Sequence, residues 1–204
     1  MKRVLVAGVV VAGVLAGAGG CAAEPERREA AYAVDGPVRV LVVDSGTGDV
    51  QVTGEGSGVA VTERQEWRGK APEVRHELVD GTLTLSYRCP GHDCSVGYVV
   101  RVPTGTEVKV KAGTGDVRLA GLTGVVTAEA GTGDVRGAFA VAPRSVRAVA
   151  GTGDVRLELP KGEEYAVDAE AGTGSVRVDV PVRIASEWKV TARAATGDVT
   201  VVGG

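Results

Sequence analysis

Apolar and polar residues alternate along much of the chain, and the alternation changes phase at a short glycine-rich motif. In most copies of this motif, the residues six, four and two positions before its threonine are small or apolar, as in Val126, Ala128 and Ala130 before Thr132. The residues between them are mostly polar, and a period of two predicts a strand with one buried face. The motif Gly-Thr-Gly-Asp-Val and its two variants occupy residues 46–50, 113–117, 131–135, 151–155, 172–176 and 195–199.

The phase reverses directly after the motif. Apolar residues now stand three and five positions after the threonine, as in Val117 and Leu119 after Thr114. A strand makes this change only through a bulge or a corner, and glycine and aspartate suit a corner because glycine tolerates positive φ and aspartate accepts hydrogen bonds from turn amides. Each repeat is therefore predicted to be a strand, a tight corner, a second strand and a short return loop.

The spacing of the motifs predicts a solenoid. From the second copy onward they begin at residues 113, 131, 151, 172 and 195, which are 18, 20, 21 and 23 residues apart. This period is too short for helical hairpins and is typical of one turn of a β-solenoid. We predict an all-β chain in which residues 38–204 form a single-domain, right-handed, β-helix-like stack of two-strand coils of 18–23 residues. Residues 54–101 lack the motif, and we expect coils or hairpins with longer strands there.

Three segments carry a resemblance to a known family. They are Val40–Val52 with its Gly48-Asp49-Val50, the strand Asp80–Leu85, and Val100–Pro103 leading into the later Gly-Asp-Val copies. In this order, the chain resembles the bacterial envelope proteins that have a β-strand-repeat domain of unknown function and are often labelled putative adhesins. The resemblance implies a β-solenoid-like fold and a surface or envelope-stress association. It implies no activity and no catalytic residues.

The N-terminus predicts export and lipid attachment. Lys2 and Arg3 precede an uncharged run that ends in small residues directly before Cys21. This pattern resembles a bacterial lipoprotein signal, so residues 1–20 are interpreted as a cleaved signal peptide and Cys21 as the lipidated residue. Plain secretion stays open, because Ala18 stands where leucine is more common. The protein is thus expected outside the cytoplasm, anchored to the cell membrane.

Composition adds two expectations. Residues 21–37 are polar and aperiodic, and we expect them to form a tether between the membrane and the domain. The formal net charge is −3, which gives no indication of a nucleic-acid partner.

Two further cysteines, Cys89 and Cys94, lie in one short segment. In an oxidising compartment a disulfide between them is the expected pairing. The alternative is a metal site that adds His92 and His76 to the two cysteines. The Cys-x-x-x-x-Cys spacing is not that of a zinc knuckle, which favours the disulfide.

The repeated aspartates raise the alternative of a calcium site. Stacked aspartates are similar to the glycine-aspartate nonapeptides that bind calcium between coils, but those have an acidic turn in both halves of each coil. Here only one half has it, and Ser175 replaces the aspartate in one copy. We therefore expect a structural corner, with no metal and no cofactor. The aspartates concerned are Asp49, Asp116, Asp134, Asp154 and Asp198.

Arginines follow the acidic positions two residues later, at Arg118, Arg136, Arg156 and Arg177. A ladder of arginines at a fixed pitch can engage a repeating anionic polymer such as a teichoic or glycolipid chain. The alternative is a solvated face whose charge the aspartates balance.

These observations favour a protein without catalysis. No Gly-x-Gly-x-x-Gly opens a helix, no Gly-x-Ser-x-Gly occurs, and return loops of about five residues are too short to build a cleft. We expect a non-catalytic, lipid-anchored module for adhesion, scaffolding or envelope-stress sensing, and the alternative is a calcium- or anionic-polymer-binding β-solenoid. Its partner is then an envelope polymer or a surface protein. A last coil ending at Thr200–Gly204 has free edge groups, which favours end-to-end self-association.

Overall fold

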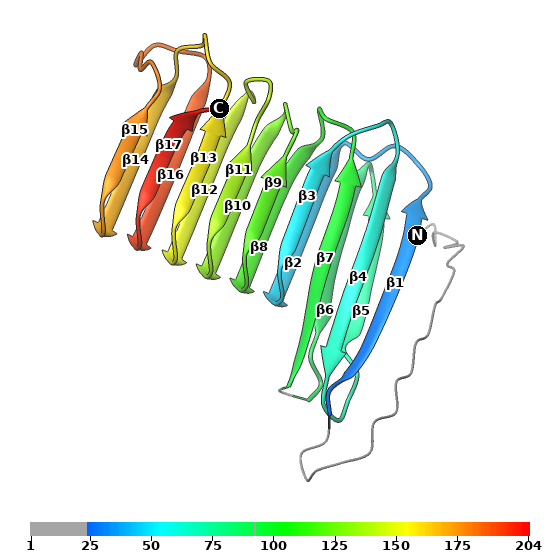
Figure 1. Ribbon diagram of the computed structural model, residues 1–204. Coiled ribbons are helices and arrows are strands. Elements are labelled where there is room, and N and C mark those ends of the chain that lie inside the picture. Colours follow the sequence, from blue (N-terminus) through cyan, green and yellow to red (C-terminus); the bar gives the residue numbers. More distant parts are fainter. Residues whose placement is uncertain (1–23, 92) are drawn as a thin grey trace.

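The computed structural model describes residues 24–91 and 93–204, and the strands of that part form two facing sheets (Figure 1). The described residues contain no helix long and apolar enough to cross a membrane. The expected signal peptide, residues 1–20, and Cys21 lie outside the described residues. In chain order the strands are β1 (Glu26–Val34), β2 (Val40–Thr47), β3 (Val50–Gly54), β4 (Val59–Trp67), β5 (Glu73–Val79), β6 (Thr82–Arg88), β7 (Cys94–Val102), β8 (Glu107–Thr114), β9 (Val117–Ala120), β10 (Val125–Thr132), β11 (Val135–Ala138), β12 (Ser145–Thr152), β13 (Val155–Leu159), β14 (Ala166–Thr173), β15 (Val176–Asp179), β16 (Lys189–Thr196) and β17 (Val199–Gly203).

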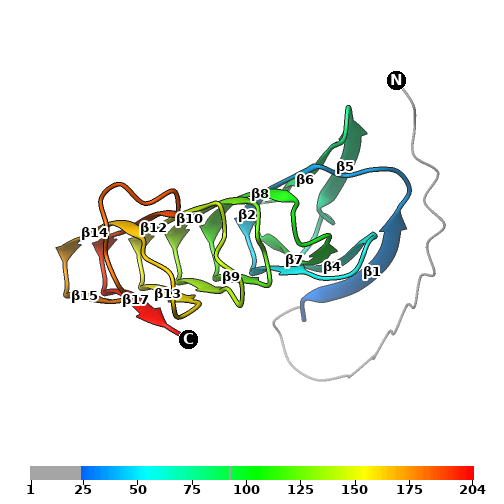
Figure 2. The same ribbon diagram turned by 90° about the horizontal axis from the view of Figure 1, so that it is seen from above.

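Each repeat contributes one strand to each sheet, as its alternation predicts. The nine-stranded sheet has the order β1-β4-β7-β3-β9-β11-β13-β17-β15, and the eight-stranded sheet has the order β14-β16-β12-β10-β8-β2-β6-β5. Figure 2 shows the two sheets face to face along the repeats and diverging where β5 and β6 leave β1 and β4. The predicted all-β solenoid is therefore confirmed.

The coils stack in parallel register on their motifs. Thr114 pairs with Thr47 on one side and with Thr132 on the other, and Thr132 pairs in turn with Thr152. Equivalent inward residues therefore lie above one another, and Ala128 is fully buried between the buried residues Val110 and Ala148. Alanine in these columns lets the two sheets approach closely, so the core is thin.

The corners require glycine because successive coils touch there through their backbones. Gly115 has a φ of +137°, and a Cβ on it would stand 2.4 Å from the carbonyl oxygen of Gly48 in the adjacent coil. A Cβ on Gly133 would likewise collide with the carbonyl oxygen of Gly115. The motif is therefore a backbone contact repeated from coil to coil.

The order of the coils differs from the order of the chain at the C-terminal end. The β16–β17 coil, expected to be the exposed last coil, lies between the coil of β12 and β13 and the coil of β14 and β15. The β14–β15 coil is the open end of the stack instead. The inward positions of β12, β14 and β16 all carry Val, Ala and Ala, so β16 can pair with either of the other two strands. The coil with Ser175 lies outermost. Asp198 therefore lies one coil further in, where its carboxylate accepts the amide of Ser175.

The expected tether is also partly wrong. Residues 26–34 form β1, which pairs antiparallel with β4 along its whole length. Ala30, Tyr32 and Val34 face the interior, and Tyr32 is only 8% exposed. Only these three positions alternate, and four charged residues precede them in the strand. The sequence pattern is therefore too short to predict β1.

Residues 59–102 combine antiparallel pairs with a continuation of the parallel stack, because β6 pairs in parallel with β2 and β7 pairs in parallel with β3. β4 pairs with β7, and β5 pairs with β6 as a hairpin turning at Asp80 and Gly81. The segment without motifs therefore contains both of the expected arrangements, a hairpin and strands that extend the stack.

Replacing Gly115 by alanine tests the close contact at the corner. The variant is expected to lose about 3 kcal/mol of the free energy of unfolding, because a methyl group must fit against the Gly48 carbonyl and φ is positive. The measurement is urea unfolding followed by circular dichroism. Gly105→Ala is the matched control, since a Cβ there meets nothing within 4 Å, and it should shift stability by less than about 1 kcal/mol. Equal midpoints for the two variants would contradict the backbone-contact explanation.

Candidate functional site

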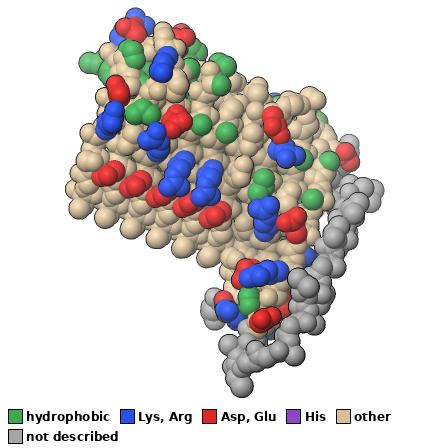
Figure 3. All heavy atoms as spheres, viewed as in Figure 1, with side chains coloured by type: hydrophobic (Ala, Val, Ile, Leu, Met, Phe, Trp, Pro, Cys, Tyr) green, Lys and Arg blue, Asp and Glu red, His purple; other side chains and the backbone are tan. Residues whose placement is uncertain are grey.

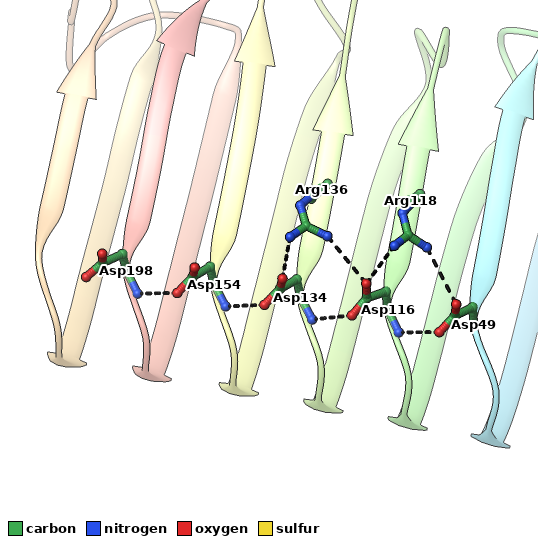
Figure 4. A network of polar contacts seen from close by, with 7 residues as sticks. All are labelled: Asp49, Asp116, Arg118, Asp134, Arg136, Asp154 and Asp198. Atoms are coloured by element: carbon green, nitrogen blue, oxygen red, sulfur yellow. Dashed lines mark hydrogen bonds and ion pairs between the residues drawn. The ribbon is translucent and has the colours of Figure 1, made fainter.

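The aspartates of the motif form a hydrogen-bonded ladder along one edge of the stack (Figure 4). The amide of Asp116 donates to Oδ1 of Asp49 at 2.9 Å, and the amide of Asp134 donates to Oδ1 of Asp116 at 3.0 Å. The amides of Asp154 and Asp198 continue the series at 2.7 and 2.8 Å. Each carboxylate therefore accepts the corner amide of the next coil, which ties neighbouring coils together.

The ladder ends at Ser175, in the outermost coil. Its amide and its hydroxyl donate to Oδ1 of Asp198 at 2.8 and 2.9 Å. These hydrogen bonds, the backbone one first, lower the pKa of the Asp198 carboxyl. Within the described residues, no further coil stacks on this outermost coil. An aspartate at position 175 would therefore have no corner amide to accept, and serine can replace it.

Two arginines of the predicted ladder bridge neighbouring aspartates through their second oxygens. Arg118 lies 2.7 Å from Oδ2 of Asp116 and 3.6 Å from Oδ2 of Asp49. Arg136 lies 3.4 Å from Oδ2 of Asp116 and pairs closely with Asp134. All of these side chains are partly or largely exposed, so each ion pair contributes little alone.

The other two predicted arginines have different partners. Arg156 pairs with Glu158 at 2.8 Å, and Arg177 pairs with Asp179 at 3.2 Å. Arg118, Arg136 and Arg156 are adjacent in the strand register, whereas Thr200 separates Arg177 from them. Figure 3 shows basic and acidic side chains gathered in rows on this face. The face is therefore a mixed ladder in which every predicted arginine has a carboxylate partner.

The hydrogen bonds give the aspartates a structural role. Their Oδ1 atoms accept amides, and Oδ2 of Asp116 and of Asp134 faces arginine. Residues 24–91 and 93–204 contain no group of three or more His, Cys, Asp or Glu residues arranged to hold a metal ion. Both carboxylate oxygens of Asp116 and of Asp134 are thus engaged within the ladder.

Cys89 and Cys94 form the expected disulfide, with their Cα atoms 5.9 Å apart. Their sulfur atoms are consequently not free to ligate a metal. His92 lies outside the described residues, and the ring of His76 lies 5.0 Å from that of Tyr32. Among the described residues of the alternative metal site, the two cysteines are therefore engaged in the disulfide and His76 lies against Tyr32.

An open groove of about 960 Å³ lies on the nine-stranded sheet near β1. The ion pairs Arg27–Glu66 and Arg64–Glu29, at 3.2 and 3.1 Å, line it together with Arg118. The Arg28 guanidinium lies 5.5 Å from the centre of the Trp67 ring. The groove thus combines paired charges with the apolar ring of Trp67. The sequence does not predict this groove, because its charged, aperiodic residues 26–29 indicate a tether and not a strand.

A buried polar cluster lies between the sheets at the same end. Glu63 is 3% exposed, and the Tyr32 hydroxyl donates to its Oε1 at 2.6 Å. The buried Tyr98 hydroxyl has no hydrogen-bond partner within residues 24–91 and 93–204. Burial raises the pKa of Tyr32 and of Tyr98, and the Glu63 carboxylate raises both further. Strict alternation in β4 could have indicated that Glu63 faces inward.

Asp134 offers a direct test of the ladder. Asp134→Ala removes the acceptor of the Asp154 amide and is expected to cost about 1–2 kcal/mol of the free energy of unfolding. Asp134→Asn keeps an Oδ1 acceptor and should lose clearly less, although both variants lose the ion pair with Arg136. Urea unfolding at neutral pH measures both values. Equal losses would mean that charge, not the amide acceptor, carries the effect.

Comparison with known proteins finds one family model that matches part of the chain. Residues 103–202 match the model of the family described as Toastrack DUF4097. The fold is similar to that of a putative cell adhesion protein from Clostridium sporogenes ATCC 15579, with 17% identity, a TM-score of 0.66, and 88% of this chain and 100% of that chain covered. A putative adhesin from Bacteroides fragilis NCTC 9343 matches at 14% identity and a TM-score of 0.41, covering 89% of this chain and 98% of that chain. A search of curated protein sequences finds no match. Residues 103–202 are therefore similar to the family described as Toastrack DUF4097, and the chain has a β-solenoid fold.

Proposed function

We propose that the protein is a non-catalytic, lipid-anchored module outside the cytoplasm that presents its nine-stranded sheet as an adhesive or scaffolding surface at the cell envelope. The observation that carries this proposal is the ladder, because it engages the repeated aspartates within the structure. What is left for a partner is a regular charged face and the adjoining open groove. The names of the similar solved structures, which describe cell adhesion proteins and adhesins, support this choice.

The arrangement of titratable groups supports a role without catalysis. The exposed carboxylates of the ladder are held by amides and arginines, and the buried Glu63 accepts from Tyr32 between the sheets. Charged side chains that line the groove are likewise engaged in ion pairs, Arg27 with Glu66 and Arg64 with Glu29.

The position of Cys21 gives the anchoring proposal a geometric consequence. Strand β1 begins at Glu26, five residues after Cys21 (26 − 21), and that length of chain spans at most ~18 Å. Lipid on Cys21 therefore holds the β1 edge and the groove close to the membrane. The 17-residue tether (21–37) expected from the sequence would have allowed a reach of about 60 Å.

Changing the lipidated residue tests the anchor. Cys21→Ser is expected to move the protein from the membrane fraction to the soluble extracytoplasmic fraction, because the acyl chains supply the binding energy. Cell fractionation and immunoblotting measure the distribution. The matched control replaces Cys89 and Cys94 by serine, which removes the disulfide and should leave the protein in the membrane. A wild-type protein that is already soluble would contradict lipid anchoring.

Anionic-polymer binding is a second candidate, favoured by the adjacent placement of Arg118, Arg136 and Arg156. Successive coils repeat at about 4.8 Å, so the guanidinium groups form a row of fixed pitch. Each has a carboxylate partner, which means that a polymer must share or displace that partner. Binding of this kind is weak per site and strongly dependent on salt.

Replacing the four ladder arginines by glutamine tests the second candidate. The variant is expected to retain a purified anionic envelope polymer at least about tenfold more weakly, a loss of ~1.4 kcal/mol spread over four charges. A co-sedimentation assay at two salt concentrations measures retention. The control removes the same charge from the eight-stranded sheet through Arg75, Arg88, Arg147 and Arg193. Equal retention by both variants would eliminate the ladder as the polymer site without affecting the anchoring result.

A further inference from the structure

The open end of the stack leaves core-facing residues uncovered. Val176 and Val178 of β15 pair in register with Val199 and Val201 of β17, which are fully buried. Their own exposures are 46% and 39%, because no further coil formed by residues 24–91 and 93–204 lies beyond β15. The nearby residues Val182 and Ile184 are also exposed, the latter at 95%. The core columns of the solenoid therefore continue to an uncovered surface.

The other sheet edges have charged side chains that oppose strand pairing. β1 begins with four charged residues, β5 carries Glu73, Arg75 and Glu77, and β14 carries Asp168 and Glu170. Charges are a common protection of edge strands. β15 differs, because its two inward valines are exposed and its two outward residues have opposite charges. It is the edge best suited to accept another strand.

The backbone amides and carbonyls of β15 that do not bond to β17 belong to its two exposed valines. The Val199 amide donates to the Ser175 carbonyl at 2.9 Å. In a parallel pair, a residue directs both of its backbone groups to the same side, so Ser175, Arg177 and Asp179 face β17. Val176 and Val178 therefore direct their amides and carbonyls toward the open side.

We propose that two copies of this chain pair through β15 in antiparallel orientation about a two-fold axis at Val178. Val178 then exchanges two backbone hydrogen bonds with Val178 of the second copy. Arg177 stands directly opposite Asp179 of the second copy, and Asp179 stands opposite its Arg177. Because these are the closely spaced pairs of an antiparallel ladder, the opposite charges face each other across the interface.

A second copy fits this edge better than the far end of another stack. The far end consists of β1 and β5, which are held in antiparallel pairs and lie on diverging sheets (Figure 2). It offers no coil of matching register for β14 and β15 together. A two-fold axis, in contrast, places each edge strand against its own copy. In the opposite sheet, Arg193 lies 2.7 Å from Asp168 and 3.7 Å from Glu170, which reduces the negative charge on β14.

Charge reversal tests the pairing in the full chain purified in detergent. Sedimentation velocity over a concentration series is expected to show a monomer–dimer equilibrium for the wild type. Arg177→Asp places acid opposite acid and should weaken dimerisation at least about tenfold. The double variant Arg177→Asp with Asp179→Arg restores opposite charges across the axis and should restore the dimer. Arg156→Asp is the matched control, because Arg156 has the same local pairing on the interior strand β13 and should leave dimerisation unchanged.

Cross-linking tests the position of the axis. Val178→Cys should form an intermolecular disulfide on mild oxidation, since the two copies of this residue face each other. Ile184→Cys is more exposed but lies off the axis, and should cross-link far less at equal concentration. A wild type that remains monomeric overturns the proposal. So does a double variant that fails to restore the dimer while circular dichroism shows it folded, or equal cross-linking of the two cysteine variants.

Discussion

The stack depends on direct backbone contact between the corners of successive coils. At each corner, a glycine with positive φ brings its Cα so close to the neighbouring carbonyl oxygen that a Cβ would clash, as at Gly133 and Gly153, where the distance would be 2.2 Å. This contact sets the corners in register. The aspartate that follows then reaches the next amide, and Val and Ala columns align behind it. The register of the corners, the aspartate ladder and the alignment of the core columns therefore all follow from the close distance between successive corners.

The same constraint separates structure from function along the chain. Because the repeated aspartates accept amides and arginines, the most conspicuous motif of the sequence serves the scaffold. The features that the repeats do not share lie toward the two ends of the stack. These are the groove beside β1 and the uncovered edge of β15. The two ends of the solenoid therefore differ from its nearly identical central coils.

The two ends differ in how they finish the stack. At the β1 end, the edge strands of both sheets are antiparallel and carry charged residues. The expected anchor lies five residues (26 − 21) before β1. At the other end, Ser175 ends the ladder and valines remain exposed. An anchored β1 edge and a self-complementary β15 edge would give the protein one end for the membrane and one end for a second copy.

The sequence alone determined the strands, corners and stacking of the repeats, since alternation around Thr132 and the phase change before Val135 are local properties. It also indicated the disulfide of Cys89 and Cys94 and the structural use of the aspartates. Only the tertiary structure decided that β16 and β17 insert before the β14–β15 coil, because coils with matching columns pair equally well in either order. It likewise decided that residues 26–34 join the sheet, because the three inward residues of β1 are stabilised by β4, a partner 31 residues away at Tyr32 and Glu63. A local pattern predicts that a segment forms a strand. Which strand it pairs with depends on contacts between residues that are far apart in the sequence.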